Sequence, residues 1–430
     1  MPTVTDRPRR RLGLDLTPLR TSRDYRLVFA GGAVSGFGSF ITYVTIPFQV
    51  AAITHDPLMV GLLGVCELVP ILVMGFVGGA LADFLDRRLL VRGGEFALAV
   101  LCAILLINSL SDRPHLWLLY AVAALTAAVD GVQRPALEAM VPRLVTPEEI
   151  PATSALQSLG MQVAQLAGPA LAGILIATVD LAWVYAFDLA TFAVSVTCLT
   201  LVNAVPPPPA ADRPSIRSVI TGLKYARSRP ELLGTYLVDI NAMFFGMPQA
   251  LYPFLAIGLG GPKVLGLLYA APAVGSLLAT IGSRWTGHVY RHGLMVIISA
   301  ALWGVGIVGA GLSDVLWLTL SCLAFAGAAD MVSGIFRMII WSQTIPDHLR
   351  GRLAGIEMLS YTTGPLLGQL RSGFMARTRL GVSGSIWVGG VLCIFGTLAL
   401  AVALPRFVGY DGKDGITRKK AEDEAWLARS

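Results

Sequence analysis

The sequence predicts an all-α membrane protein of twelve spanning helices, arranged as two six-helix bundles. Charged residues make up only 14% of the 430 residues and hydrophobic residues 55%, whereas soluble domains carry about 25% charged residues. Apolar runs of about 20 residues, the length that spans a bilayer, recur along the chain. A proline-rich polar stretch interrupts them near the middle, so the runs divide into two sets of six.

Taken in order, the chain begins with a polar, Arg-rich segment, residues 1–26. The apolar run that follows is too long for the core of a signal peptide, so we interpret it as a retained first helix. The first bundle, residues 27–204, holds the spans expected at 27–52, 60–82, 89–110, 115–141, 151–178 and 182–204. The second bundle, residues 231–405, holds those expected at 232–259, 264–286, 293–312, 315–345, 352–376 and 382–404. A polar tail, residues 406–430, follows.

A linker, residues 205–230, joins the bundles. It opens with four prolines, 206–209, which cannot continue a helix and favour an extended spacer. Several Arg and Lys residues follow within 215–228, a pattern that favours a basic amphipathic helix on the membrane surface.

Basic residues concentrate in every second turn between the spans. They occupy the N-terminal segment, the turn at 82–92, the linker, the turns at 284–292 and 346–352, and the tail. Because positively charged loops face the cytoplasm, both termini are expected there. Contact with anionic lipid headgroups then explains the net charge of +6 and the pI of about 9.2. The basic residues form no single patch of the kind that binds nucleic acid.

No pattern indicates an enzyme, a metal or a cofactor. The five cysteines lie within apolar runs and form no Cys-x-x-Cys pair, so we interpret them as packing residues. The five histidines fall in expected loops or at helix ends. The phosphate-binding loop of ATPases is absent from the sequence, so we expect no direct use of ATP.

The turn between the second and third spans carries the motif on which the functional interpretation depends. It reads Gly79-Ala80-Leu81-Ala82-Asp83-Phe84-Leu85-Asp86-Arg87-Arg88. This string resembles the loop of the major facilitator superfamily, Gly-x-Leu-Ala-Asp-Arg-x-(Gly/Asp)-Arg-(Arg/Lys), and departs from it at Phe84. The resemblance implies a transporter that works by alternating access, in which the aspartate contacts the start of the eleventh helix. The residues implied as a conformational switch are Gly79, Leu81, Asp83, Asp86, Arg87 and Arg88.

A second likeness lies in the fifth span, where small residues recur around a Gly-Pro pair. It resembles the helix-5 motif of major facilitator antiporters, which implies export rather than uptake. The residues that carry it are Ala164, Gly168, Pro169 and Gly173. Small residues let helices approach closely and proline permits a bend, so ordinary helix packing is the alternative interpretation.

Acidic residues within the spans are the candidates for proton coupling. A charge near the bilayer centre costs at least about 2.5–3.5 kcal/mol, so each such acid needs a partner, water or a proton. The candidates are Glu67, Asp130, Asp239 and Asp330. Hydrogen bonding between helices is the alternative for each of them. We interpret Arg134, Glu138 and Arg337 as anchors to lipid headgroups.

In the superfamily that the turn resembles, helices 1, 4, 7 and 10 line the substrate cavity. Here these spans supply aromatic rings together with hydroxyl and amide groups, and no fixed cation lies in the middle of helices 1 or 7. That mixture suits an amphipathic aromatic ligand better than a sugar or a free amino acid. The cavity candidates are Phe40, Tyr43, Gln49, Asn241, Phe244, Phe245, Gln249, Tyr252 and Phe336.

Strings such as Leu251-Tyr252-Pro253 and Leu349-Arg350-Gly351-Arg352 resemble the branch of the superfamily that holds enterobactin, macrolide and multidrug exporters. This resemblance implies a proton antiporter in the bacterial inner membrane that exports an enterobactin-like catecholate siderophore. A multidrug or macrolide exporter is the alternative, and a non-transporting receptor on the same fold is a remoter one. We expect a monomer whose partners are its substrate, protons and the bilayer.

The topology can be tested with single cysteines introduced at Arg88 and Arg217 on a cysteine-free background. Both positions lie in segments expected to face the cytoplasm. An impermeant thiol reagent added outside intact cells should therefore leave both unlabelled, as measured by mass shift after purification. Ready labelling of either position contradicts the topology.

Overall fold

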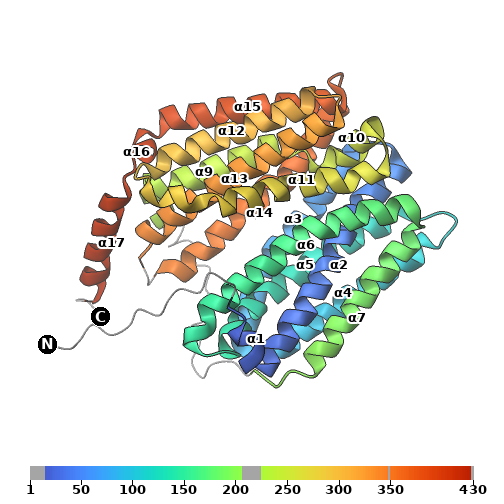
Figure 1. The fold of residues 1–430 in the computed structure, drawn as a ribbon, viewed down its shortest axis with the longest axis horizontal. Coiled ribbons are helices and arrows are strands. Elements are labelled where there is room, and N and C mark those ends of the chain that lie inside the picture. Colours follow the sequence, from blue (N-terminus) through green and yellow to red (C-terminus); the bar gives the residue numbers. More distant parts are fainter. Residues whose placement is uncertain (1–14, 206–223, 347–348, 428–430) are drawn as a thin grey trace.

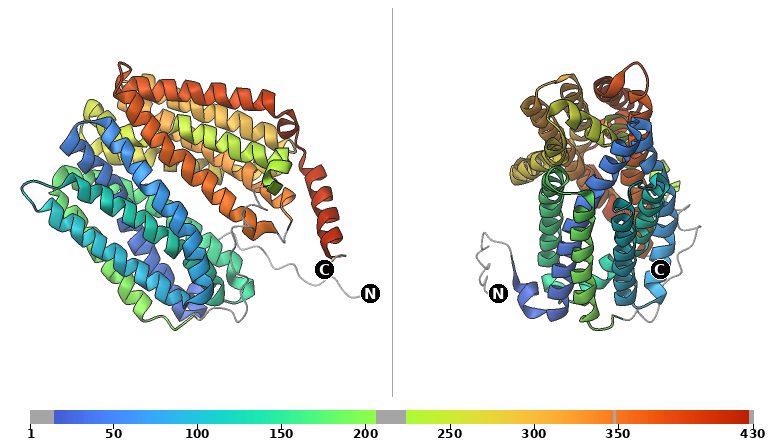
Figure 2. Two further views of the ribbon diagram at one scale, coloured as in Figure 1. Left: turned by 180° about the vertical axis from the view of Figure 1, so that it is seen from behind. Right: turned by 90° about the vertical axis from the view of Figure 1, so that its right-hand side faces the viewer.

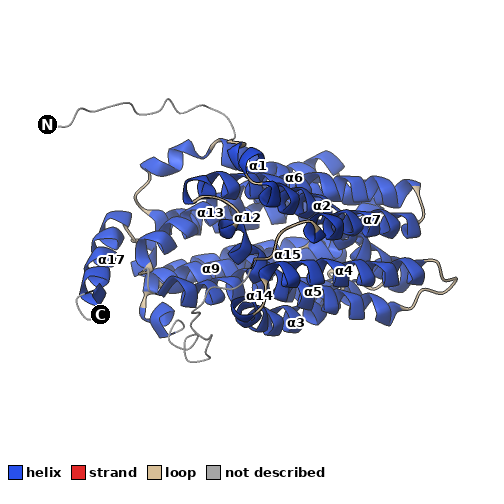
Figure 3. Cartoon of the chain, turned by 90° about the horizontal axis from the view of Figure 1, so that it is seen from below, coloured by secondary structure: helices blue, strands red, loops and turns tan. Residues whose placement is uncertain are grey.

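The structure is a computed structural model that describes residues 15–205, 224–346 and 349–427. Every regular element in this part of the chain is a helix, apart from one isolated β-bridge between Arg291 and Asp411 (Figure 1, Figure 3). Most of the linker expected at 205–230 lies outside the described residues.

Six long helices and three short ones come from the first half of the chain. They are α1 (Thr17–Thr21), α2 (Arg23–Thr54), α3 (Pro57–Phe84), α4 (Arg87–Ser109), α5 (Leu116–Met140), η1 (Val141–Arg143), η2 (Pro147–Glu149), α6 (Ile150–Thr178) and α7 (Leu181–Thr200). The side chains of Ser22, Asp56 and Asp86 accept backbone N–H bonds at the starts of α2, α3 and α4. These caps satisfy donors that a helix start leaves free, so the helices begin sharply after short turns.

The second half of the chain supplies the remaining long helices together with several short ones. They are α9 (Pro230–Gly246), η3 (Gln249–Leu251), α10 (Tyr252–Leu259), α11 (Pro262–Ile281), η4 (Ser283–His288), α12 (His292–Leu312), α13 (Leu316–Thr344), α14 (Arg350–Ala376), α15 (Gly381–Ala403), α16 (Pro405–Val408) and α17 (Gly412–Leu427).

Eleven segments in the described part of the chain are long and apolar enough to cross a membrane, counting α9 to α10 as one. The twelfth long helix is α14, whose 27 residues equal a span in length. Its hydropathy is lower because it carries charged and hydroxyl side chains such as Glu357, Ser360 and Arg371. The predicted all-α fold with twelve long helices is therefore confirmed.

The seventh span departs from the continuous helix expected at 232–259. It ends at Gly246, passes through Met247 and Pro248, and resumes in η3 and α10. Proline has no N–H and disfavours a helical conformation in the residue before it, so Pro248 explains the break.

The two bundles touch mainly along two helix pairs, α3 with α14 and α6 with α11. A Cβ atom added to Gly173 of α6 would lie 2.6 Å from the backbone nitrogen of Gly266 of α11, so only glycine fits. Near the start of α3, Asp56 lies 3.7 Å from Arg377 of the other bundle. Figure 1 and Figure 2 show the bundles meeting at the end that holds α10 and diverging toward the end that holds α1 and α17. We call these the α10 end and the α1 end.

The chain after α15 folds back onto the second bundle. Phe407 of α16 is fully buried, and Arg418 of α17 lies 3.4 Å from Glu231 at the start of α9. Arg229, just before α9, pairs with Glu422. The tail helix is thus tied to the α1 end of the seventh span.

The close packing of α11 against α13 predicts that Gly275→Ala destabilises the protein. The new Cβ would overlap the backbone oxygen of Ala324. Overpacking costs about 1–3 kcal/mol or more, so we expect a clearly lower unfolding temperature in detergent.

The matched control is Gly93→Ala on α4, where an added Cβ meets no atom within 4 Å. This change should leave the unfolding temperature unchanged or raise it, because alanine favours a helix over glycine. Equal unfolding temperatures for the two variants would contradict the packing described here.

Candidate functional site

A cluster of charged side chains joins three helices of the second bundle. Arg337 of α13 pairs with Asp239 of α9, and its Nη2 lies 3.7 Å from Oδ1 of Asp330, also on α13. Ser360 of α14 donates a hydrogen bond to Oδ2 of Asp239 at 3.0 Å. We call these four residues the Arg337 cluster.

The Arg337 cluster contains more negative than positive groups. One guanidinium faces two carboxylates, so the cluster carries a net charge of −1 when both acids are ionised and none when one is protonated. Asp239 is 5% and Arg337 12% exposed, whereas the side chain of Asp330 is 39% exposed. Glu357 of α14 also lies within electrostatic reach of Arg337. Because an uncompensated charge is costly in this environment, the two acids of the cluster remain candidates for proton binding.

Arg337 lies in a different place from the one the sequence suggested. We interpreted it as an anchor to headgroups, whereas the structure turns it inward to the two acids. The spacing of Asp330 and Arg337, seven residues apart, already placed both on one face of the helix. Only the tertiary structure places α9, with Asp239, against that face.

Glu67 and Asp130 belong to the first bundle, on α3 and α5. Glu67 is half-buried, Asp130 is exposed, and the two are within electrostatic reach of each other. Arg134 bonds Glu138 at 3.1 Å. Its guanidinium also lies 5.4 Å from the ring centre of Tyr361 on α14, so this part of α5 faces the second bundle.

Four aromatic residues meet where the bundles touch. Tyr43 of α2 lies 6.3 Å from Phe40 and 5.9 Å from Tyr269 of α11, and Tyr269 lies 4.9 Å from Tyr252 of α10, all edge to face. The hydroxyl of Tyr43 donates to Oε1 of Gln249 at 2.6 Å. We call Phe40, Tyr43, Tyr252 and Tyr269 the aromatic group. Phe40, Tyr43 and Tyr252 of this group, and Gln249, are cavity candidates predicted from the sequence. As expected for a cavity between bundles, they come from both bundles.

Three other cavity candidates lie inside a bundle. Gln49 is 2% exposed and accepts a hydrogen bond from the hydroxyl of Tyr185 at 2.7 Å. Asn241 donates to the backbone oxygen of Cys393 at 3.0 Å, and Phe336 is fully buried. These side chains hold helices of one bundle together and do not line a cavity between bundles. The sequence did not show this, because an apolar span does not reveal which of its faces points to a neighbouring helix.

Phe244 and Phe245, the last two cavity candidates, adjoin a half-buried cation that sequence reasoning missed. Arg371 of α14 donates from Nε to the oxygen of Phe244 at 3.2 Å and from Nη2 to that of Phe245 at 2.5 Å. A third bond, from Nη1, reaches the oxygen of Ser385 at 3.3 Å. The break after α9 leaves its last carbonyls without helical partners, so Arg371 takes the place of the missing N–H groups. The sequence signal that could have identified this residue is an Arg within an apolar span.

The described part of the turn between α3 and α4 ties the ends of the first-bundle helices together. Arg87 donates to the oxygen of Ala139 at 2.8 Å, near the end of α5. Arg88 donates to the oxygens of Leu199 and Thr200 at 3.1 and 2.5 Å, at the end of α7. Basic side chains stabilise helix C-termini by binding such carbonyls.

Of the other residues in this turn, Asp86 caps α4 and also accepts from the backbone N–H of Val205 at 3.2 Å. Leu81 is half-buried. At Gly79 and Asp83 the structure describes only the helical backbone of α3, so the switch role of these two residues stays a prediction.

The four residues of the helix-5 motif lie where α6 contacts α2 and α11. A Cβ atom on Gly168 would lie 2.7 Å from Cβ of Phe40, and Gly173 faces Gly266 as described above. The backbone oxygen of Pro169 also contacts Gly266. Ala164 is 5% exposed and lines a small apolar cleft between α2 and α6.

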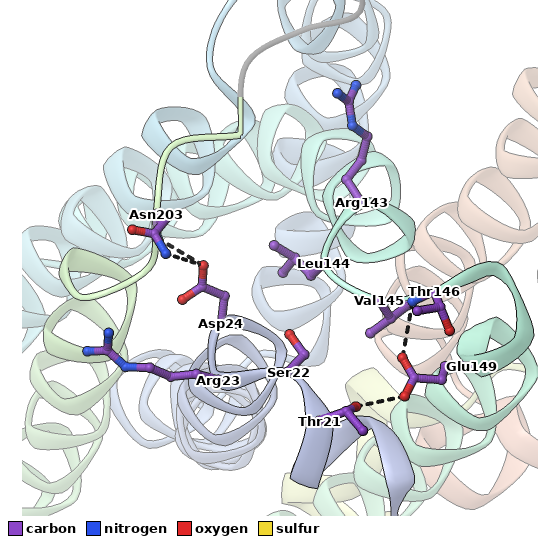
Figure 4. Close-up of a pocket in the computed structure, with 10 residues that line it drawn as sticks. All are labelled: Thr21, Ser22, Arg23, Asp24, Arg143, Leu144, Val145, Thr146, Glu149 and Asn203. Carbon is purple, nitrogen blue, oxygen red and sulfur yellow. Dashed lines mark hydrogen bonds between the residues drawn. The ribbon is translucent and has the colours of Figure 1, made fainter.

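A larger polar cavity of about 490 Å³ lies at the α1 end of the first bundle. Figure 4 shows Asp24 directed toward Asn203 and Thr21 toward Glu149 around it. These bonds measure 2.8 Å from Nδ2 of Asn203 to Asp24 and 2.7 Å from the hydroxyl of Thr21 to Glu149. The cavity is lined by neither the Arg337 cluster nor the aromatic group.

A family model described as transmembrane secretion effector matches residues 14–423. The chain belongs to this family, a branch of the major facilitator superfamily. This transporter is similar to the enterobactin exporter EntS of Citrobacter koseri, with 28% identity over 395 residues that cover 90% of this chain and 93% of that protein. The predicted superfamily and branch are thereby confirmed.

Solved structures agree on the fold. A D-xylose–proton symporter superposes with a TM-score of 0.70 at 12% identity, covering 90% of this chain and 99% of that one. A bacterial homologue of the human lysosomal transporter Spinster, solved inward-facing and unoccupied, gives 0.67 at 13% identity, with 92% and 97% covered. Family membership and the exporter relative, with the apolar helices, make the protein a multi-pass transporter of the inner membrane with a small-molecule substrate.

The contacts of Arg371 predict a loss of stability in Arg371→Met. Methionine retains an aliphatic stem but leaves the carbonyls of Phe244 and Phe245 without donors, and each unsatisfied buried group costs about 1–3 kcal/mol. We expect a clearly lower unfolding temperature in detergent, with partial recovery in Arg371→Lys, which keeps a charge without the planar fork.

Arg377→Met, just beyond the end of α14, is the control. Its side chain is 61% exposed and its pairing with Asp56 is a surface contact, so the change should have little effect. If Arg371→Met proves as stable as Arg377→Met, the capping role is refuted.

Proposed function

We propose that the protein exports an amphipathic aromatic molecule, a catecholate siderophore of the enterobactin type, from the cytoplasm in exchange for protons. Membership of the family supplies the transporter class, and likeness to the EntS protein over 90% of the chain supports the cargo. The single observation that supports proton coupling is the Arg337 cluster, where one cation serves two acids.

The cargo passes between the bundles. In this proposal the α1 end faces the cytoplasm, since the basic turns lie there. The bundles touch at the α10 end and diverge toward the α1 end, so this conformation takes up its cargo from the cytoplasmic side. The turn between α3 and α4 acts as the conformational switch, with Asp83 bracing the start of α14 and with Arg87 and Arg88 keeping the first bundle rigid.

The aromatic group gives the cargo its binding surface. Catechol rings stack edge to face on Tyr43 and Tyr269, which already pack in that way. The hydroxyl of Tyr43 and the amide of Gln249 bond each other at 2.6 Å and exchange this bond for one to the cargo. Phe244 and Phe245 are assigned to the wall of the same space because they lie at the end of α9, next to η3.

Proton binding changes the Arg337 cluster from charged to neutral. Asp330 receives the proton, because it is the more exposed of the two acids and lies further from Arg337. Arg337 then pairs with Asp239 alone, and the electrostatic attraction between Asp330 and Arg337, both on α13, is lost. Since a few kcal/mol separates the two states of such a protein, a change in one ion pair is sufficient to shift their populations. Glu67 and Asp130 form a second acidic site on the first bundle.

The test uses purified protein in liposomes with an imposed pH gradient, an internal pH dye and enterobactin as cargo. Asp330→Asn should lower proton-coupled enterobactin transport at least about tenfold, because a neutral amide cannot take up the proton. Asp239→Asn should lower it as well and should also reduce the unfolding temperature, since Arg337 loses its closer partner.

Asp314→Asn, in the exposed loop before α13, is the matched control and should behave as the unmodified protein. Unchanged coupling in Asp330→Asn refutes the assignment of the proton site. Transport of macrolides or dyes without transport of enterobactin supports the multidrug alternative.

A further inference from the structure

One helix, α14, takes part both in the Arg337 cluster and in the contact between the bundles. It packs against α9 of the second bundle and against α3 of the first (Figure 3). Two consecutive residues of α14 reach in these two directions. Ser360 donates to Oδ2 of Asp239 at 3.0 Å. The ring centre of Tyr361 lies 5.4 Å from the guanidinium of Arg134 on α5.

Glu357 lies one turn before both of these contacts. It precedes Ser360 by three residues and Tyr361 by four, and these spacings place side chains on one face of a helix. Glu357 is half-buried and is within electrostatic reach of Arg337 in the second bundle and of Arg134 in the first. This acid therefore faces one cation from each bundle.

Two further titratable groups face Glu357, namely Tyr236 of α9 and Glu138 of α5. Tyr236 adds no charge while its hydroxyl is protonated. Glu138 bonds Arg134 at 3.1 Å, and Asp130, one turn earlier on α5, is also within electrostatic reach of Arg134. The side chains of Arg134 and Glu138 are 56% and 68% exposed. Water screens so exposed a pair, which leaves Arg134 able to change its partner.

We propose that Glu357 is a positioning residue that transmits the charge state of the Arg337 cluster to the first bundle. The inference rests on the proposed function, because it takes Asp330 as the proton site. With both of its acids ionised, the cluster carries a charge of −1 and repels Glu357 toward Arg134. A proton on Asp330 removes this repulsion. Arg337 then attracts Glu357, and Arg134 loses part of the attraction that it feels.

This exchange of partners acts at the α1 end, which faces the cytoplasm in the proposed function. Arg134 precedes the end of α5 at Met140 by six residues, and Glu357 follows the start of α14 at Arg350 by seven. Attraction between Glu357 and Arg134 draws the bundles together at this end, and its loss lets them separate. Proton binding thus favours the conformation that is open to the cytoplasm, in which an exporter releases its proton and takes up cargo.

The experiment measures the distance between the bundles with two spin labels on the purified full chain in nanodiscs. The labels are attached to Ser154→Cys, near the start of α6, and Ser342→Cys, near the end of α13, on the cysteine-free background; both positions are exposed. The ratio of separated to closed populations should rise at least about fivefold from high to low pH, as expected for coupled sites. In Glu357→Gln the rise should be less than about twofold, because the amide has no charge to exchange.

The companion variants separate charge from packing. Glu357→Asp keeps the carboxylate and should retain most of the response to pH. Arg134→Gln should suppress the response as Glu357→Gln does, and the double variant should match either single one, because both changes remove the same interaction.

Asp314→Asn, in the exposed loop before α13, is the control for removal of an acid and should respond as the labelled protein without it. Unfolding temperatures close to that of Asp314→Asn show that the other variants are intact. Arg134→Gln decides the result if Glu357→Gln does not fold.

Three results overturn the proposal. A full response to pH in Glu357→Gln refutes the role of Glu357, and loss of the response in Asp330→Asn at the same time leaves the proton site intact. Equal loss in Glu357→Gln and Glu357→Asp assigns Glu357 to packing instead of charge. A distance that stays constant with pH while Glu357 is in place refutes this coupling together with the proposed proton drive, and the cargo is then judged by transport alone.

Discussion

Inside a bilayer there is no water to bond a free backbone or side-chain group, so each polar group must find a partner within the protein. This constraint explains why every regular element across the described spans is a helix. It also explains how the seventh span can break at Pro248. The last carbonyls of α9 have no helical partner, and Arg371 from α14 supplies the donors, at the cost of fixing these helices to each other.

The same constraint separates structural acids from those suited to titrate. Asp188 is fully buried, yet it accepts hydrogen bonds from Thr42 and Thr191. Its hydrogen-bond donors are neutral side chains of the same bundle, so it ties α2 to α7. In the Arg337 cluster a single guanidinium serves two carboxylates, and Asp330 is partly exposed. An acid that shares its partner and is partly exposed is therefore the candidate that we propose as the proton carrier.

Small residues decide how near the two bundles approach and where they leave room. Gly173 and Gly266 bring α6 and α11 into backbone contact at the α10 end. Further along α6, Gly168 accommodates Phe40 of α2, whereas Gly160 leaves space next to Phe29. One helix therefore holds contact positions at one end and an open apolar cleft at the other.

Much of this architecture follows from the sequence alone. Apolar runs of bilayer length dictate the long helices, and the turn from Gly79 to Arg88 with the helix-5 residues indicates the superfamily. The acids within the spans, including Asp239 and Asp330, stand out because a charge in hydrocarbon is costly. These inferences need only local composition and spacing.

The tertiary structure decided what those residues contact. Arg337, expected at the headgroups, pairs with Asp239 on another helix, and Arg371 meets carbonyls more than a hundred residues away. Gln49, expected in the cavity, bonds Tyr185 inside the first bundle. The physical reason is common to all three. A membrane helix is apolar toward lipid and toward its neighbours alike, so its sequence does not reveal which face meets which helix, and that pairing is fixed only when the bundles pack.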